Sequence, residues 1–87
     1  MQTIYKYPLT QTQKQTLSLP EFYEILTVQG QDNRPCLWAL VDPSMPRVNV
    51  EIAIYGTGDN IYVEDLRYIS TFQIHGGALV FHAFEIF

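Results

Sequence analysis

The sequence predicts a small all-β domain of about seven short antiparallel strands, arranged as a sandwich or an open barrel. Three observations carry this prediction. Short runs of alternating apolar and polar residues recur along the chain, segments rich in Pro, Gly, Asn and Asp separate them, and no segment has the apolar spacing of a long helix. At most one short helical turn is expected, at Glu64–Arg67. We treat residues 1–87 as a single domain.

The first half of the chain supplies two strands and then a hairpin. Thr3–Tyr7 is the first strand, and Pro8 ends it or places it at a sheet edge. Leu17 and Leu19 share one face of the second, and Phe22–Tyr23 after it are expected to cover an open end of the fold. The third strand is Glu24–Gln31. Leu26 and Val28 are expected on one of its faces, and Ile25, Thr27 and Gln29 on the other. The segment Gln31–Pro35 has the composition of a loop and would close a hairpin.

Two further strands follow in the middle of the chain. Cys36–Asp42 is apolar on both faces, which is typical of a central strand. Arg47–Tyr55 alternates, which predicts one buried side and one solvated or partner-facing side. The residues of its two faces are Val48, Val50, Ile52 and Ile54 inward, and Asn49, Glu51, Ala53 and Tyr55 outward.

The chain ends in a predicted hairpin, Tyr68–Ile74 and Ala78–Ile86, closed by Gly76–Gly77 in a type I′ turn. The last strand is apolar on both faces, whereas an antiparallel strand with one wet face alternates. We therefore expect its second face to be covered by another copy of the chain. A domain of this size buries only about 60% of its unfolded surface, so association would add stability.

Composition excludes several classes of function. The formal net charge is −4 and the five basic residues are scattered, so we expect no binding to duplex nucleic acid. A single cysteine rules out an internal disulfide, and no His, Cys, Asp or Glu cluster has metal-ligand spacing, so neither a metal nor another cofactor is expected. The chain lacks a signal-peptide pattern and an apolar run of about 20 residues, which predicts a cytoplasmic protein without membrane contact.

The glycine-rich segment Gly56-Thr57-Gly58 is the first candidate binding site. Two glycines allow backbone N–H groups to converge, and the threonine adds a hydroxyl, so the segment is compatible with a phosphate-binding nest. An ordinary turn at the end of a strand explains the same residues, since the segment lacks the lysine of a P-loop and no long helix follows.

Further candidate ligand-binding residues are aromatic or basic: His75, Arg67, Arg47, Tyr55 and Trp38. The arginines stand near strand ends as either phosphate clamps or solvated charges. Trp38 and Tyr55 are either base-stacking platforms or packing residues. The other histidine, His82, lies among apolar residues and is expected to be a neutral core histidine with its N–H satisfied. No catalytic set is expected, because no serine has a nucleophile motif.

Four blocks of the sequence resemble a family of small proteins encoded by bacteriophages, and the resemblance runs from end to end. The blocks are Ile4–Pro8 (IYKYP), Cys36–Pro43 (CLWALVDP), Gly56–Gly58 (GTG) and Thr71–Glu85 (TFQIHGGALVFHAFE). Small oligomeric phage proteins of this size include sponges that sequester nucleotide immune signals, such as cyclic ADP-ribose isomers or cyclic dinucleotides. The resemblance therefore implies a homo-oligomer that holds a small nucleotide in the cytoplasm of an infected bacterium, without cleaving it.

Two other functions stay open at this point. A protein-binding module that inhibits a host protein or serves phage assembly would use an outward strand such as Asn49–Tyr55. A nucleotide-cleaving enzyme would use His75 or His82 as general acid or base.

Overall fold

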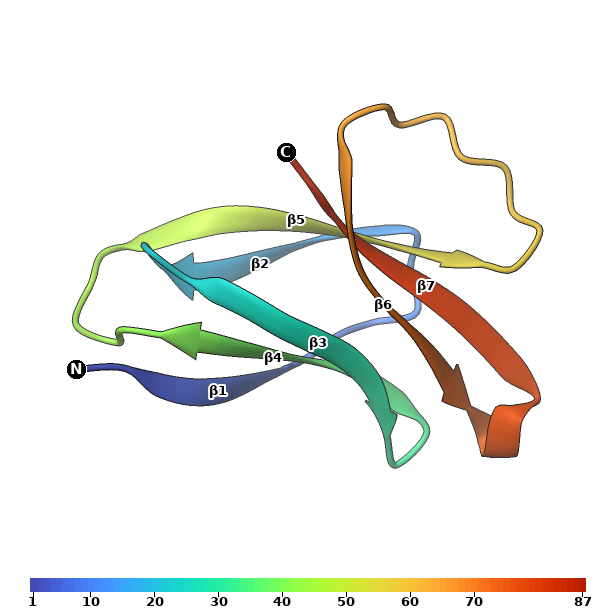
Figure 1. Cartoon of the computed structure of the whole chain (residues 1–87), viewed down its shortest axis with the longest axis horizontal. Coiled ribbons are helices and arrows are strands. Elements are labelled where there is room, and N and C mark those ends of the chain that lie inside the picture. Colours follow the sequence, from blue (N-terminus) through green and yellow to red (C-terminus); the bar gives the residue numbers. More distant parts are fainter.

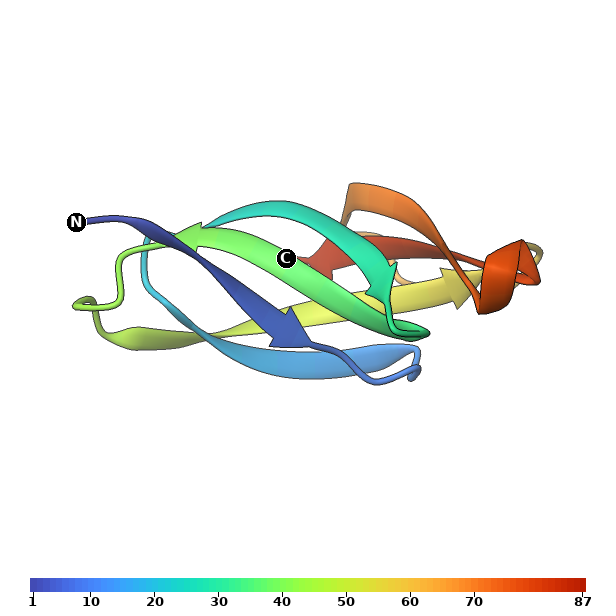
Figure 2. The same ribbon diagram turned by 90° about the horizontal axis from the view of Figure 1, so that it is seen from below.

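The computed structural model describes all residues 1–87. Seven strands form an antiparallel three-stranded sheet of order β1-β4-β3 and an antiparallel four-stranded sheet of order β2-β5-β7-β6. The strands are β1 (Thr3–Pro8), β2 (Lys14–Pro20), β3 (Glu24–Gln31), β4 (Arg34–Val41), β5 (Arg47–Gly56), β6 (Leu66–Ile74) and β7 (Leu79–Ile86). The sheets make two layers of an open sandwich, which confirms the predicted fold class (Figures 1 and 2). No helix has the length and apolarity needed to cross a membrane.

The core lies between the two sheets and follows the predicted alternation. β4 is the central strand of its sheet, as predicted, and β5 is an interior strand of the larger sheet. Their inward side chains are buried, which removes apolar surface from water and stabilises the sandwich. These side chains are Leu37, Ala39 and Val41 of β4 and Val50, Ile52 and Ile54 of β5.

The outward face of β5 is more buried than the alternation of its residues predicted. Asn49 and Glu51 are exposed, but Ala53 is fully buried and Tyr55 is only 4% exposed. The neighbouring strand β7 explains this, because Phe84 pairs with Ala53 and its ring lies edge-on to Tyr55 at 6.2 Å. The prediction of a solvated or partner-facing side was therefore wrong for this half of β5.

The last strand, β7, has one face in the core and one on the outside of the larger sheet. Ala83 and Glu85 are buried on the core side. The outward residues, Val80, His82, Phe84 and Ile86, are half-buried within the single chain. That a second copy covers this outer face stays a prediction.

Two tight turns face each other across the sandwich. Gly76 (φ 66°, ψ 22°) and Gly77 (φ 93°) have the dihedral angles of the predicted type I′ turn, within the 3-10 turn η1 (His75–Gly77). Asp32 and Asn33 turn β3 into β4 with φ values of 53° and 61°, so this loop is shorter than predicted. The Asn33 side-chain oxygen accepts a 2.9 Å hydrogen bond from the His75 amide, which joins the tips of both hairpins.

Three local predictions were wrong. A β-bulge at Leu26 breaks the alternation of β3, so Leu26 is 42% exposed instead of sharing the buried face of Val28. Glu64–Arg67 forms no helical turn, because Leu66 already pairs with Ile86 of β7 and the chain enters β6 there. Phe22 covers no open end and is exposed, with a φ of 61°.

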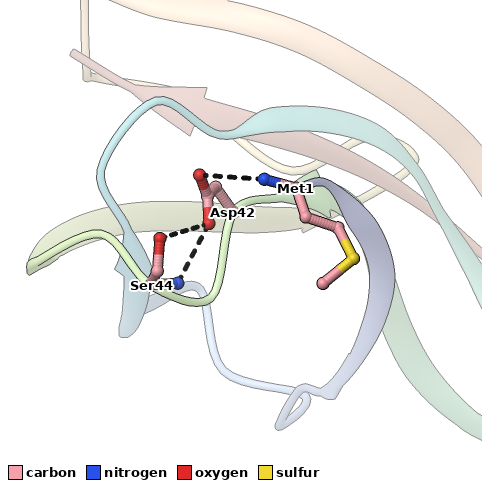
Figure 3. Close-up of polar contacts among 3 residues, drawn as sticks. All are labelled: Met1, Asp42 and Ser44. Atoms are coloured by element: carbon pink, nitrogen blue, oxygen red, sulfur yellow. Dashed lines mark hydrogen bonds and ion pairs between the residues drawn. The ribbon is translucent and has the colours of Figure 1, made fainter.

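The turn after β4 is held by Asp42, as Figure 3 shows. Its Oδ1 accepts hydrogen bonds from the Ser44 amide at 3.0 Å and the Ser44 hydroxyl at 2.7 Å, and its Oδ2 lies 3.6 Å from the amino group of Met1. The hydrogen bonds from Ser44 favour the charged form and lower the pKa of Asp42 below its usual 3.8. Asp42 therefore acts as a turn residue, in agreement with its position before Pro43.

The two sheets touch most closely where β3 lies beside β6. The Ser70 hydroxyl donates to the Val28 carbonyl at 2.6 Å and accepts from the Val28 amide at 2.9 Å. Gly30 lies so near β6 that a Cβ there would meet the Gln73 carbonyl oxygen at 2.5 Å. A serine side chain thus supplies the hydrogen bonds that a neighbouring strand would supply at the edge of β3.

We expect Ser70→Ala to lower the free energy of unfolding by about 1–3 kcal/mol for each main-chain group left without a partner. The reason is that the buried residue Val28 would lose the partners of both its amide and its carbonyl. Urea unfolding measures the change. Ser18→Ala is the matched control, since Ser18 is exposed, and we expect it to change stability by less than about 0.5 kcal/mol. Equal effects of the two substitutions would contradict the stabilising role given to the hydrogen bonds between Ser70 and Val28.

Candidate functional site

A cleft opens between the first halves of β3 and β6, and we call it the β3–β6 cleft. Its volume is about 280 Å³. Strand β3 and the residue before it supply one wall, β6 supplies the other, and β7 supplies one residue. The lining residues are Tyr23, Glu24, Ile25, Leu26, Arg67, Tyr68, Ile69 and Glu85.

The cleft exists because both walls are irregular at the same level. β3 shifts register between Ile25 and Thr27, and β6 shifts register between Tyr68 and Ser70. Each bulge bends its strand and interrupts regular pairing. On the side of this level toward the starts of β3 and β6, before the contact between Ser70 and Val28, the two strands therefore separate. Glu85, at that end of the core, then borders an accessible cleft.

Glu85 is the polar group of the cleft with the least exposure. It belongs to the core face of β7, yet its side chain borders the cleft and the residue is only 7% exposed. Its Oε2 accepts a hydrogen bond from the Tyr23 hydroxyl at 2.5 Å, while its Oε1 lies 3.7 Å from Nη1 of Arg67. The first contact is a hydrogen bond, and the second is a looser ion pair.

Tyr23 and Arg67 differ in how firmly they are held. Burial, and then the hydrogen bond to Glu85, raise the pKa of Tyr23 from 10.0 to about 12, so its hydroxyl keeps its proton at neutral pH. The Arg67 side chain is 65% exposed and its guanidinium carbon lies 4.8 Å from the centre of the Phe87 ring. Arg67 therefore offers most of its donors to solvent or to a ligand.

Tyr68 is oriented by contacts on the outer face of the larger sheet. Its ring lies edge-on to Phe84 at 5.8 Å, and its hydroxyl is 2.9 Å from the Thr71 hydroxyl. The Thr71 hydroxyl in turn contacts Nδ1 of His82 at 2.9 Å, and Nε2 of His82 contacts the Thr57 hydroxyl at 2.8 Å. His82 is thus satisfied at both ring nitrogens, as predicted, but it lies half-buried on the outer face and not in the core.

A second hollow of about 440 Å³ lies beside the glycine-rich segment. It is lined by Gly56, Thr57, Ala78 and the first three residues of β7, Leu79–Phe81. The Gly56 amide already donates to the carboxylate of Asp59 at 2.8 Å, so a phosphate would find an anion in its place. The local geometry is that of a turn after β5, with Gly58 at φ 93°.

The predicted binding residues do not come together at one place. Arg67 lines the β3–β6 cleft, whereas Gly56 and Thr57 line the second hollow. Arg47 and Gly56 stand at opposite ends of β5, about 30 Å apart at the usual rise of a strand. The others lie outside the lining of both hollows, namely Tyr55 and Trp38 on the outer faces of their sheets, His75 in η1 and Gly58 in the turn.

The arginine at the start of β5 is engaged locally. Arg47 donates from Nε to the Ser18 hydroxyl at 2.8 Å and from Nη2 to the Ser18 carbonyl at 2.7 Å. Trp38 is half-buried on the outer face of the smaller sheet, paired with Lys6 and Thr27 across the strands. Neither residue borders the cleft that holds Arg67.

Sequence reasoning missed the role of Glu85, Tyr23 and Tyr68. The signal for Glu85 was present, since it is a lone carboxylate on the face of the last strand that also carries Phe81 and Ala83. A charge at an inward position is rarely tolerated unless it is paired or opens onto a site. Tyr23 had no such signal, because its partner Glu85 lies 62 residues further along the chain.

The cleft combines an acceptor, a cation and an aromatic face, which is an arrangement suited to recognising a ligand. The Glu85 carboxylate accepts hydrogen bonds, the Arg67 guanidinium donates to anions, and Tyr23 provides ring surface. The ring of Tyr68 packs instead against Phe84 on the outer face. No group of three or more His, Cys, Asp or Glu side chains lies close enough to hold a metal ion.

We expect Tyr23→Phe and Tyr7→Phe to change stability in opposite directions. The first removes a hydrogen bond to a carboxylate and lowers the free energy of unfolding by about 1.5–3 kcal/mol. The Tyr7 hydroxyl is buried without a partner, so its removal raises the same quantity by up to about 1 kcal/mol. Urea unfolding of both variants measures the two changes, and a loss of stability in Tyr7→Phe would contradict the assignment of its hydroxyl.

The raised pKa of Tyr23 predicts a pH dependence at the alkaline side. A folded-state pKa above the unfolded value means that the contribution is complete below pH 10 and is lost as the pH rises through about 12. The difference in unfolding free energy between the wild type and Tyr23→Phe should thus be constant from neutral pH up to pH 10 and shrink above it. A difference in unfolding free energy that grows above pH 10 would contradict the raised pKa of Tyr23.

Comparisons with known proteins give one match. Residues 1–86 match the model of a protein family described as a domain of unknown function, DUF7352. No curated protein and no solved structure matches the chain.

Proposed function

The chain belongs to the DUF7352 family, and we propose that it binds and sequesters a small nucleotide signal in the β3–β6 cleft without cleaving it. The observation that supports the proposal is the set of groups facing this cleft. A buried carboxylate, an exposed guanidinium and the side chain of Tyr23 border the same space of about 280 Å³. Sequestration requires recognition of this kind and no catalytic group.

The base and the phosphate of a nucleotide each have a counterpart among these groups. The ring of Tyr23 offers surface to a base, and Glu85 offers acceptors to the polar edge of that base. Arg67 at the rim offers donors to a phosphate, which guanidinium groups bind in a forked geometry. The net charge of −4 would repel a long polyanion but leaves one local arginine for a small one.

The size of the cleft bears on assembly. A volume of about 280 Å³ is slightly below the range of about 300–1,000 Å³ that is usual for small-molecule sites. Tyr68 and Phe87 are exposed large side chains, and Phe87 also contacts Arg67 at the rim. A homo-oligomer that packs these side chains against a second copy would enclose the part of the ligand outside the cleft.

The proposed setting follows from the resemblance to phage proteins and not from the geometry. It is the cytoplasm of an infected bacterium, where the protein would remove a nucleotide signal made by an antiviral defence. Cyclic ADP-ribose isomers and cyclic dinucleotides are the signals considered.

Titration calorimetry with a panel of adenine and guanine signalling nucleotides tests the proposal. We expect Arg67→Gln to weaken binding about 10-fold or more, because a charged hydrogen bond to phosphate is lost. Arg47→Gln is the matched control and should bind as the wild type does, since Arg47 is engaged with Ser18 away from the cleft. If none of the nucleotides in the panel released or absorbed heat on mixing with the protein, the proposal would be wrong.

Native mass spectrometry of the protein from cells that produce such a signal tests sequestration directly. A symmetric oligomer that releases an intact nucleotide on denaturation is the expected result. A released mass equal to a cleavage product would contradict sequestration and support an enzyme instead.

A protein-binding module is the second candidate, and a different observation favours it. β1 is an edge strand of the smaller sheet, and Ile4 and Tyr5 on it are exposed. An exposed edge can pair with a strand of a partner, here a host or phage protein. β5, which the sequence offered for this role, is an interior strand and has no free edge.

A further inference from the structure

The hydrogen-bonding capacity of Glu85 is only partly used within the chain. A carboxylate offers about four lone-pair positions on its two oxygens. One position on Oε2 is taken by the Tyr23 hydroxyl, and Oε1 lies 3.7 Å from Arg67, which is beyond an ordinary hydrogen bond. Two adjacent acceptors thus border the β3–β6 cleft at a residue that is itself buried.

Two adjacent acceptors select a ligand with two adjacent donors. Guanine presents such a pair, because its N1–H and its 2-amino group point in the same direction. Adenine presents a donor next to an acceptor nitrogen, and cytosine does the same, so one carboxylate oxygen would face a lone pair. Uracil presents a single N–H between two carbonyl oxygens. A site with buried polar groups rejects a ligand that leaves them unpaired.

The walls of the cleft suit a flat ring whose polar edge points at Glu85. Ile25 and Ile69 come from opposite strands and line the two sides of the cleft. The sugar and phosphate are attached at the end of the base that points away from Glu85, so they would lie outside the cleft, where the exposed Arg67 side chain can extend toward them. The cleft volume suits one base and leaves the rest of a nucleotide outside.

We propose that the β3–β6 cleft selects guanine, with the Glu85 carboxylate accepting from N1–H and from the 2-amino group. This inference rests on the proposed function and narrows its ligand class to guanine-containing nucleotides. Among the signals considered above, it favours guanine-containing cyclic dinucleotides over cyclic ADP-ribose isomers. Tyr23 is a positioning residue, because it holds one oxygen of Glu85 and need not touch the ligand.

Titration calorimetry on the full chain with three probes tests the selection. The probes are the 5′-monophosphates of guanosine, inosine and adenosine. Inosine lacks only the 2-amino group, so we expect its monophosphate to bind about 10-fold or more weakly than that of guanosine. Adenosine monophosphate should bind more weakly still, because its N1 lone pair faces the carboxylate.

The variant Glu85→Gln gives a sharper result than loss of binding. A glutamine presents one donor and one acceptor, so guanine should lose affinity while adenine gains it, and the order of the two should reverse. Arg47→Gln is the control, since Arg47 lies away from the cleft and this variant should keep the preference for guanine. A reversed order of the two affinities cannot result from unfolding of the variant, because an unfolded protein would bind neither nucleotide. If Glu85→Gln does not fold, the comparison of guanosine and inosine monophosphates on the wild type still tests the proposal.

The outcomes separate the two proposals. Equal affinity for guanosine and adenosine monophosphates, or a preference for adenosine, overturns guanine selection and leaves nucleotide binding in place. Equal affinity for guanosine and inosine monophosphates also overturns it, because the 2-amino contact is then missing. Binding of none of the probes, nor of any signalling nucleotide, overturns both.

Discussion

The double hydrogen bond between the Ser70 hydroxyl and the main chain of Val28 is the contact on which the sandwich depends. It joins an edge of the smaller sheet to an edge of the larger one, so that two separate ladders behave as one layered body. It also marks the boundary of the cleft. On one side Gly30 allows close approach to Gln73, and on the other the bulges at Leu26 and Ile69 push the strands apart.

A charged group at the end of a small core carries a physical cost, since burial of an unpaired carboxylate is unfavourable. Glu85 is tolerated because Tyr23 donates to it, Arg67 lies nearby and the cleft admits solvent or a ligand. The same features suit it to recognition. A carboxylate held in place by a tyrosine would already be oriented before a ligand arrived, so the proposed binding would require less ordering.

Much of the fold could be predicted from alternation and turn residues, as the central position of β4 and the type I′ turn at Gly76 illustrate. The errors arise where tertiary contacts override the local pattern. The bulge at Leu26 interrupts a regular period, and Tyr55 is dry because of Phe84, a residue far along the chain. Less of the candidate site could be predicted. Arg67 was among the predicted binding residues, but Glu85 and Tyr23, which lie beside it in the cleft, meet only through packing of the two sheets.

The pairing of the strands predicts an order for folding. β3–β4 and β6–β7 are local hairpins closed by turns with positive φ, and such hairpins form in about 1–10 μs. β1 and β2 pair instead with β4 and β5, across long stretches of chain, which is entropically slow. The contact between Asn33 and His75 ties the two fast hairpins together at their tips. They can therefore serve as the nucleus onto which the first strands of the chain add last.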